Sequence, residues 1–313
     1  MAGTIFQDSK LPLTTWLRAM WQLTSQKNGV SALRLQRELG LGSYKTAWTL
    51  LHKLRRAMVR PGRERWQGSV EVDEAYWGGE EAKVRGRLTY DKARIAVAAE
   101  AEGQRLGRIR LRHIADTSRK TLHGFIAEVV APGSTVQTDG WPAYRELQGY
   151  VHEPQVQRRQ PKDADLLLPR VHLVISLFKR WLLGTHHGAI AQDYLQDYLD
   201  EFTFRFNRRT SASRGKLFYR LVQQAVHVAP STFDSITAPN PSGSVESRKY
   251  LGCILNPPRY AHAAHDRRSD AVPADARRLF GREHSGQRHR GRASRGEGPR
   301  RARVVYRQAS PRR

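Results

Sequence analysis

The sequence predicts an α/β protein that begins with a small helical region and ends in a basic tail. Apolar residues follow helical spacing before residue 62, alternate as in strands between residues 66 and 140, and return to helical spacing from residue 166. With 313 residues, the chain is long enough for two domains and a sizeable core. We therefore predict a helical domain at 1–62, an α/β domain at 66–230 and an irregular to disordered Arg-rich tail at 231–313.

The composition indicates a polyanionic partner. The net charge is +25 and the isoelectric point is about 10.9, which favours nucleic acid over an anionic membrane. Cys253 is the single cysteine, so the sequence excludes a disulfide framework and a zinc site built from cysteines. We find no signal-peptide pattern and no apolar run near the roughly 18 residues of a spanning helix. We therefore expect a cytoplasmic, nucleoid-associated protein without membrane contact.

The tail carries much of this charge. Residues 257–313 contain 16 Arg, no Lys and five acidic residues, a net charge of +11. Few large apolar residues occur there, so burial of apolar surface cannot offset the entropy of ordering the segment, and we expect disorder. Two interpretations stay open: a DNA-binding arm, or translation of an unselected reading frame.

The N-terminal region predicts three helices, at about 11–28, 31–40 and 43–59. Ser31 is a suitable N-cap, and Gly40 suits a helix end. The third helix places apolar residues on one face and basic residues on the other. Two helices joined by a short turn, the second one basic, are typical of a helix-turn-helix, although a helical bundle with a solvated charged face gives the same pattern. The predicted DNA-binding residues of this region are Lys45, Lys53, Arg55 and Arg56.

A strand from Ser69 to Gly79 contains the first candidate site residue. Val70 and Val72 alternate with Glu71 and Asp73, so the two acids share one face. Carboxylates on a strand built for burial are costly unless they are paired or bind a cation. Asp73 is therefore a candidate metal ligand, and the alternative is an acidic residue that faces solvent on a half-buried strand.

Two further strands, at 93–102 and 107–114, are expected to pair with the first one in antiparallel fashion. A helix from Thr117 to about Val130 follows, and then a short strand that ends at Asp139. Because Gly140 and Pro142 break this strand directly after the acid, its carboxylate lies at a strand end, open to a ligand. Residues 152–165 predict mostly loop.

Helices return in the C-terminal half, at 166–186, 189–209 and 216–228. Pro169 fits the first turn of the first of these, and Gly184 is its expected end. The second has an aromatic stripe, which we interpret as core rather than as a platform for stacking bases; its members are Tyr194, Tyr198, Phe202 and Phe206.

This order of elements is expected of a ribonuclease-H-like α/β core. In that architecture one carboxylate from a central strand and one from the end of a neighbouring strand converge, and a later helix supplies a third ligand. Attack on a phosphodiester places charge on the entering and leaving oxygens, which two cations about 3.5–4 Å apart can stabilise. Carboxylate oxygens suit Mg²⁺.

Four motifs resemble, in order, the DDE-type transposases of the bacterial insertion-sequence-1595 group. They read V-E-V-D-E-A-Y-W-G-G, T-D-G-W-P-A-Y, L-F-K-R-W-L-L-G-T-H-H-G and Y-L-D-E-F-T-F-R-F-N-R-R. The opening G-T-I-F and the segment S-A-L-R-L-Q-R-E-L-G-L-G-S-Y-K-T-A-W also resemble the helical DNA-binding region of that group. The resemblance covers roughly residues 2–215.

The resemblance implies a two-metal site for Mg²⁺ or Mn²⁺. It implies Asp73 and Asp139 as the first two ligands and places His172 at the third position, 33 residues after Asp139. Imidazole suits Mn²⁺ or Zn²⁺ better than Mg²⁺. His172 is alternatively a phosphate-positioning residue or an ordinary interior histidine, and Asp163 and Asp165 are alternative ligands. Phosphate contacts are expected of the following pair, Lys179 and Arg180.

The implied activity is metal-dependent cleavage and strand transfer of an insertion sequence. The implied partners are the terminal inverted repeats and target DNA, with assembly into a homo-oligomer on DNA. Relatives usually carry an N-terminal zinc ribbon that this chain lacks, and the tail matches no part of the family pattern. The rival hypothesis is therefore a non-catalytic DNA-binding protein or an inactive truncated remnant.

Overall fold

The computed structural model describes residues 2–60, 62–78, 92–155, 167–188 and 190–238. The chain divides into two compact units, 1–259 and 260–313, and every described residue belongs to the first. Most of the predicted tail therefore lies outside the described residues, and its expected disorder stays a prediction. Among the described residues, no helix combines the length and the apolar character needed to cross a membrane.

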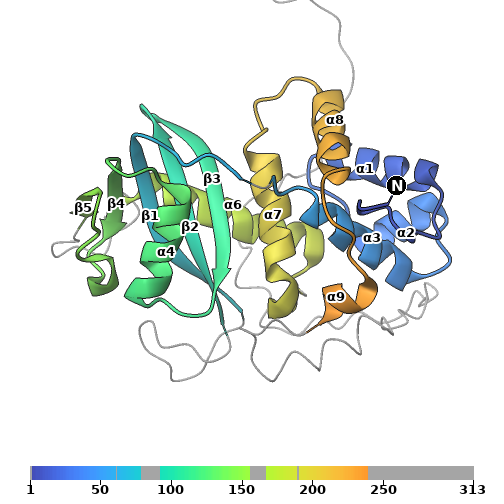
Figure 1. Ribbon diagram of the computed structural model, residues 1–313, viewed down its shortest axis with the longest axis horizontal. Helices are drawn as coiled ribbons and strands as arrows, with labels where there is room; N and C mark the ends of the chain where they lie inside the picture. The colour runs from blue at the N-terminus through green and yellow to red at the C-terminus, as the bar shows by residue number, and fades with distance from the viewer. Residues whose placement is uncertain (1, 61, 79–91, 156–166, 189, 239–313) are drawn as a thin grey trace, which may run out of the picture. The chain divides into compact units, whose positions relative to one another are not determined.

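A five-stranded mixed sheet has the strand order β3-β2-β1-β4-β5 (Figure 1). The first three strands pair antiparallel, whereas β4 joins β1, and β5 joins β4, in parallel. This confirms the predicted antiparallel trio and the strand that ends at Asp139, and the arrangement fits a ribonuclease-H-like core. The strands are β1 (Ser69–Trp77), β2 (Ala93–Glu102), β3 (Arg105–Ile114), β4 (Thr135–Asp139) and β5 (Val151–Gln155).

Helices cover both faces of this sheet (Figure 1). On one face α4 (Arg119–Val129) packs on Val70 and Val72 of β1 in the smaller apolar core. Alternate strand residues, such as Val97 and Leu111, face the larger core with α6 (Pro169–His186) and α7 (Leu195–Phe206). Successive strand residues thus fill two different cores, as the pleat requires.

The N-terminal region contains α1 (Leu13–Ser25), α2 (Ala32–Leu39) and α3 (Tyr44–Arg56). As predicted, the Ser31 side chain caps α2 by accepting from the Arg34 N–H, and Gly40 ends it with a φ of 63°. The buried face of α1 contains Trp16, Met20 and Leu23, whereas Leu13 and Trp21 are 44 % and 47 % exposed. Two further helices, α8 (Arg214–Ala225) and the short α9 (Phe233–Thr237), complete this part of the fold.

One strand was not predicted. Val151–Gln155 forms β5, where the sequence indicated loop from residue 152; residues 156–166, with Asp163 and Asp165, lie outside the described residues. This edge strand is largely exposed and contains Pro154. An exposed edge strand needs no apolar alternation, and it tolerates proline, so its sequence resembles a loop.

The N-cap of α4 and the last residue of α6 differ from the prediction. The cap of α4 is Ser118 rather than Thr117, since its hydroxyl accepts from the Thr121 N–H. The end of α6 is His186 rather than Gly184, and His187 adopts the left-handed conformation that closes it, at a φ of 53°. Pro169 begins α6 as predicted. The aromatic stripe of η3 (Gln192–Tyr194) and α7 is core, with all four rings at most 9 % exposed.

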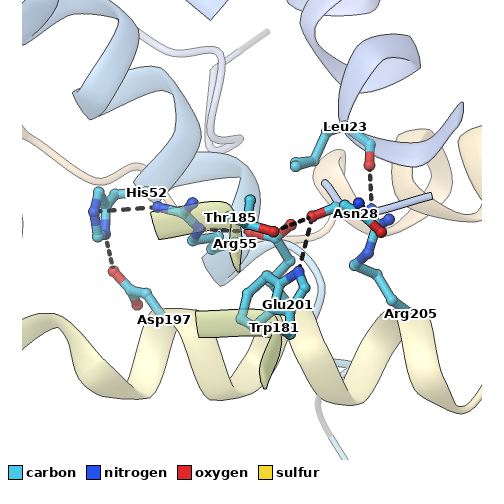
Figure 2. A network of polar contacts seen from close by, with 9 residues as sticks. All are labelled: Leu23, Asn28, His52, Arg55, Trp181, Thr185, Asp197, Glu201 and Arg205. Carbon is cyan, nitrogen blue, oxygen red and sulfur yellow. Dashed lines mark hydrogen bonds and ion pairs between the residues drawn. The ribbon is translucent and has the colours of Figure 1, made fainter. Parts of the chain in front are cut away.

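Buried charges join α3 to α7 (Figure 2). Arg55 is 1 % exposed, and its Nε donates to Glu201 Oε2 at 2.8 Å. His52 is fully buried, with Nδ1 2.6 Å from Asp197 Oδ2 and Nε2 3.3 Å from Arg55 Nη1. The prediction that Arg55 lies on a DNA-facing surface of α3 is therefore wrong, because its charge is neutralised inside the protein by an acid 146 positions further along the chain.

A second set of contacts holds the α1–α2 connection against α6 and α7 (Figure 2). The Asn28 carbonyl accepts from Trp181 Nε1 at 2.8 Å and from Thr185 Oγ1 at 3.0 Å. Arg205 donates to the carbonyls of Leu23, Gln26 and Lys27. Gly29 follows with a φ of +81°, and a Cβ there would lie 2.7 Å from Glu201 Oε1.

Little of α3 is left for a DNA groove. The Lys45 ammonium lies 3.7 Å from the centre of the Phe233 ring of α9, and Arg56 contacts Asp197 at 3.7 Å and the Ser235 carbonyl at 3.5 Å. Lys53 is half-buried. A recognition helix must expose several side chains to base edges. The helix-turn-helix assignment and its residues Lys45, Lys53 and Arg56 stay predictions.

Acid should destabilise the α3–α7 contact through His52. Arg55 donates to Nε2, so the imidazole must be neutral, with its Nδ1–H donating to Asp197. Burial lowers the pKa of His52 to about 4. The unfolded chain, with an ordinary histidine pKa of about 6.5, therefore binds more protons between pH 6.5 and 4. Stability is retained above this window and lost as the pH falls through it, by on the order of 3 kcal/mol.

The measurement is urea unfolding of the wild type and His52→Gln from pH 7.5 to 4. We expect the free-energy difference between the two proteins to shrink as the pH falls. A difference that stays constant across the window would show that His52 does not take up its proton on unfolding.

Candidate metal centre

Two aspartates come together because β1 and β4 run in parallel. Their pairing begins with Ser69 opposite Thr135 and ends with Glu71 opposite Gln137. Asp73 and Asp139 are each two residues further along. Within these described strands β1 continues beyond this point, paired with β2 as far as Trp77. The two acids therefore sit where the two parallel strands stop pairing, at the carboxyl end of β4.

Glu74 completes a cluster of three carboxylates. One ligand oxygen of each of Asp73, Glu74 and Asp139 lies within 4.8 Å of those of the other two. Asp73 and Glu74 are 8 % and 7 % exposed, and Asp139 is half-buried. The alternative that Asp73 faces solvent is therefore wrong. Sequence reasoning missed Glu74, because strict alternation assigns it to the opposite face of β1 from Asp73.

Hydrogen bonds fix each carboxylate. Asp73 Oδ1 accepts from the Glu74 N–H at 2.8 Å, and Asp139 Oδ1 accepts from the Trp141 N–H at 3.1 Å. The Tyr144 hydroxyl donates to Glu74 Oε2 at 2.8 Å. Tyr144 belongs to η1 (Pro142–Tyr144), the turn that directly follows β4, and its side chain is fully buried. The chain after Asp139 therefore folds back and holds the neighbouring acid.

The electrostatics of Tyr144 report concentrated negative charge. Its pKa is raised well above the usual value, first by burial and then by Glu74, Asp73 and Asp139. The phenol therefore stays protonated at neutral pH and acts as a hydrogen-bond donor. Three carboxylates at this separation repel one another unless a cation compensates them.

The donor set suits hard divalent cations. All three candidate ligands are carboxylates, the oxygen donors that Mg²⁺ and Mn²⁺ prefer, and two or three of them with substrate phosphate are a usual complement. No cysteine or histidine belongs to the cluster among the described residues. The residues therefore fit the divalent metal that the sequence predicted.

A fourth acid, Glu71, fixes the helix beside the cluster. It is 1 % exposed, and its Oε2 accepts from the N–H groups of Arg170 and Val171 at 2.8 and 3.0 Å. Its Oε1 accepts from Arg170 Nη1 at 2.7 Å. A carboxylate at a helix N-terminus satisfies free N–H groups and complements the helix dipole. Glu71 thus anchors the first turn of α6 two residues from Asp73.

Comparison with known families assigns the part of the chain that contains this cluster. Residues 65–207 match the model of the ISXO2-like transposase domain. This chain carries a transposase domain of that family. The matched range contains β1, β4 and α6, and therefore all three clustered acids and Glu71. No curated protein matches the chain.

His172 lies in the first turn of α6 in this transposase domain, one residue after Val171. It is half-buried, and its N–H donates to the Leu168 carbonyl at 3.1 Å. The group of described residues with ligand atoms within 4.8 Å of one another contains Glu74 and does not contain His172. Its role as third ligand stays a prediction, and so does a role in positioning phosphate.

The other predicted DNA-binding residues of the transposase domain are accessible. Lys179 and Arg180 are exposed on α6, seven and eight residues after His172. Their carbon stems leave the charged groups free to reach a polyanion at the surface. Contact with phosphate is consistent with this exposure and stays a prediction.

Replacement of Glu71 should loosen α6 from β1. Glu71→Ala removes the acceptor of two backbone N–H groups and of a guanidinium that is only 20 % exposed. Removal of one partner from a buried ion pair costs about 3–5 kcal/mol. We expect urea unfolding to show a loss of that size, whereas the exposed control Glu153→Gln should change the free energy of unfolding by less than about 0.5 kcal/mol. Equal effects of the two substitutions would contradict the anchoring role.

Proposed function

We propose that the protein is a metal-dependent DNA transposase that cleaves a phosphodiester at the end of its insertion sequence and joins that end to target DNA. The observation that supports this is the cluster of Asp73, Glu74 and Asp139 inside an ISXO2-like transposase domain. Family membership implies DNA as the partner. Assembly of several copies on paired ends is part of the same proposal.

The clustered carboxylates would hold Mg²⁺ or Mn²⁺. Bound divalent ions polarise the scissile phosphate and stabilise charge on the attacking and leaving oxygens. The protein contributes rigidity: the Trp141 and Glu74 N–H groups and the Tyr144 hydroxyl orient the three acids before substrate arrives. Preorganised groups avoid a reorganisation cost in the transition state.

The chain also supplies charge for substrate binding. With a net charge of +25, it attracts DNA at long range and at a rate that depends on salt. Lys179 and Arg180 are exposed on the helix that Glu71 anchors beside the acids. In this proposal they contact phosphates that flank the reacting bond.

Loss of either aspartate should abolish strand transfer while DNA binding persists. We expect Asp73→Asn and Asp139→Asn to reduce joining of an oligonucleotide end to target DNA by roughly 100-fold or more, in Mg²⁺ and in Mn²⁺. Glu38→Gln, an exposed acid on α2, is the matched control. Wild-type activity in both aspartate variants would refute the site. DNA binding without cleavage by the wild type would favour a non-catalytic protein or an inactive remnant.

The third ligand can be identified by direct metal binding. Glu74 is in the cluster and His172 is not, so we expect Glu74→Gln to weaken Mn²⁺ binding, measured calorimetrically, by about 10- to 100-fold. His172→Ala should change the affinity by less than about twofold, on the same argument. The opposite ranking would support the histidine that the resemblance placed at this position.

A further inference from the structure

A second charged cavity lies away from the clustered acids. It has a volume of about 340 Å³ and is bordered by β3, by α7 and by the segment that connects α3 to β1. The strand order places β3 two strands from β1 on the side opposite β4, which carries Asp139. Trp66 lies before β1 begins, whereas Asp73 lies near its middle. The cavity therefore lies beside the edge strand β3, whereas the cluster lies on the interior strands β1 and β4.

The cavity is rich in arginine. Five guanidinium groups line it against two carboxylates, Glu64 and Asp200. Trp66 is buried beneath two of the guanidinium groups, with its ring 5.5 Å from Arg108 and 5.1 Å from Arg110. The five arginines are Arg60, Arg63, Arg108, Arg110 and Arg208.

Three of the five guanidinium groups form no ion pair with a carboxylate among the described residues. Arg108 pairs with Glu100 at 2.6 Å, and Arg60 reaches Glu64 at 3.6 Å. Arg110 instead donates to the backbone carbonyls of Glu64 and Glu128. Arg208 donates to the Phe204 carbonyl at 3.0 Å. In the part of the chain that the structure describes, neither these two nor Arg63 forms an ion pair with a carboxylate.

The arginines of the cavity lie close enough together to lower the pKa of one of them. Burial and the neighbouring Arg63 and Arg108 lower the pKa of Arg110 to about 10. Burial also raises the pKa of Asp200 to about 7, so this acid is only partly ionised near neutral pH. Because guanidinium groups stay charged, the cavity keeps a net positive charge that a bound anion would neutralise.

Two polar side chains lining the cavity lack partners. Among the described residues, Thr203 Oγ1 and Gln224 Oε1 are buried polar atoms without a hydrogen bond. Buried polar atoms are nearly always satisfied, and the Thr203 hydroxyl can donate to an anion, whereas Gln224 Oε1 is an acceptor that an anion does not satisfy. The volume is about ten times the share of one water molecule in the liquid, enough for a phosphate with its sugar.

We propose that this cavity, which we call the β3 arginine pocket, binds a backbone phosphate of double-stranded DNA. Arginine forks match phosphate oxygens bidentately, and a neutral hydroxyl such as that of Thr203 adds a donor. Contacts of this kind position a duplex without reading its sequence. Only the choice of DNA as the source of the phosphate rests on the proposed function.

The test is duplex binding by Arg63→Ala/Arg208→Ala, measured by fluorescence anisotropy over a range of salt concentrations. Chelator prevents cleavage during the measurement. We expect about tenfold weaker binding at low salt, and a plot of log K against log salt that is shallower by about 2, near one unit for each lost phosphate contact. The charge-conserving Arg63→Lys/Arg208→Lys should restore most of the slope. The matched control is Arg119→Ala/Lys120→Ala, which removes two exposed charges from α4.

The proposal would be overturned if Arg63→Ala/Arg208→Ala bound the duplex with the same affinity and salt dependence as Arg119→Ala/Lys120→Ala. Inorganic phosphate separates the two sources of the anion. Suppose that phosphate raises the melting temperature of the wild type but not of the alanine pair, and that the two proteins bind the duplex with equal affinity. The pocket then binds free phosphate, and the DNA assignment is wrong. Strand transfer by Asp73→Asn fails or survives independently of these results, so the two proposals can fail separately.

Discussion

A buried carboxylate on β1 joins the sheet of the transposase domain to α6. Glu71 is 1 % exposed, and both of its oxygens accept hydrogen bonds from the start of α6. An ionised group in such a place is tolerated only because two backbone N–H groups and a guanidinium replace its water. The same contact fixes where α6 begins, so the position of His172, Lys179 and Arg180 relative to the sheet depends on it. A structural ion pair thereby supports a site in which it takes no direct part.

The clustered acids are also buried charges that need compensation, but their surroundings differ from those of Glu71. Asp73 and Glu74 are nearly as buried as Glu71, yet their neighbours are further carboxylates. Hydrogen bonds from Tyr144 and from backbone N–H groups orient them, and the three carboxylates together concentrate negative charge at one place. A divalent cation would compensate it. Glu71 thus has its cationic partner within the chain, whereas the proposed function assigns a bound cation to the clustered acids.

Sequence patterns predicted the sheet well because its strands obey local rules. Alternation identified β1, and the break at Gly140 and Pro142 located Asp139 at a strand end. The two aspartates, 66 positions apart in the sequence, lie together as expected. Glu74 was missed because alternation predicts only the face of the strand from which a side chain projects. It does not predict which groups a long side chain contacts beyond the paired part of β1 and β4. Arg55 was misplaced because its partner is 146 positions away, and no periodicity within α3 reveals such a contact. Edge strand β5 lacked an apolar signal altogether.

The placement of charge restricts how this protein can use α3. Its Arg55 is committed to Glu201, its His52 must be neutral to accept from Arg55, and Lys45 covers the Phe233 ring. Release of Arg55 toward a phosphate would leave Glu201 buried without its cation, at a cost of about 3–5 kcal/mol. One phosphate contact at a wet surface returns less than that. In the proposed function, attraction for DNA must therefore come from cations without an acid partner. Among the described residues, Arg63, Arg110 and Arg208 of the β3 arginine pocket and the exposed pair on α6 meet this condition.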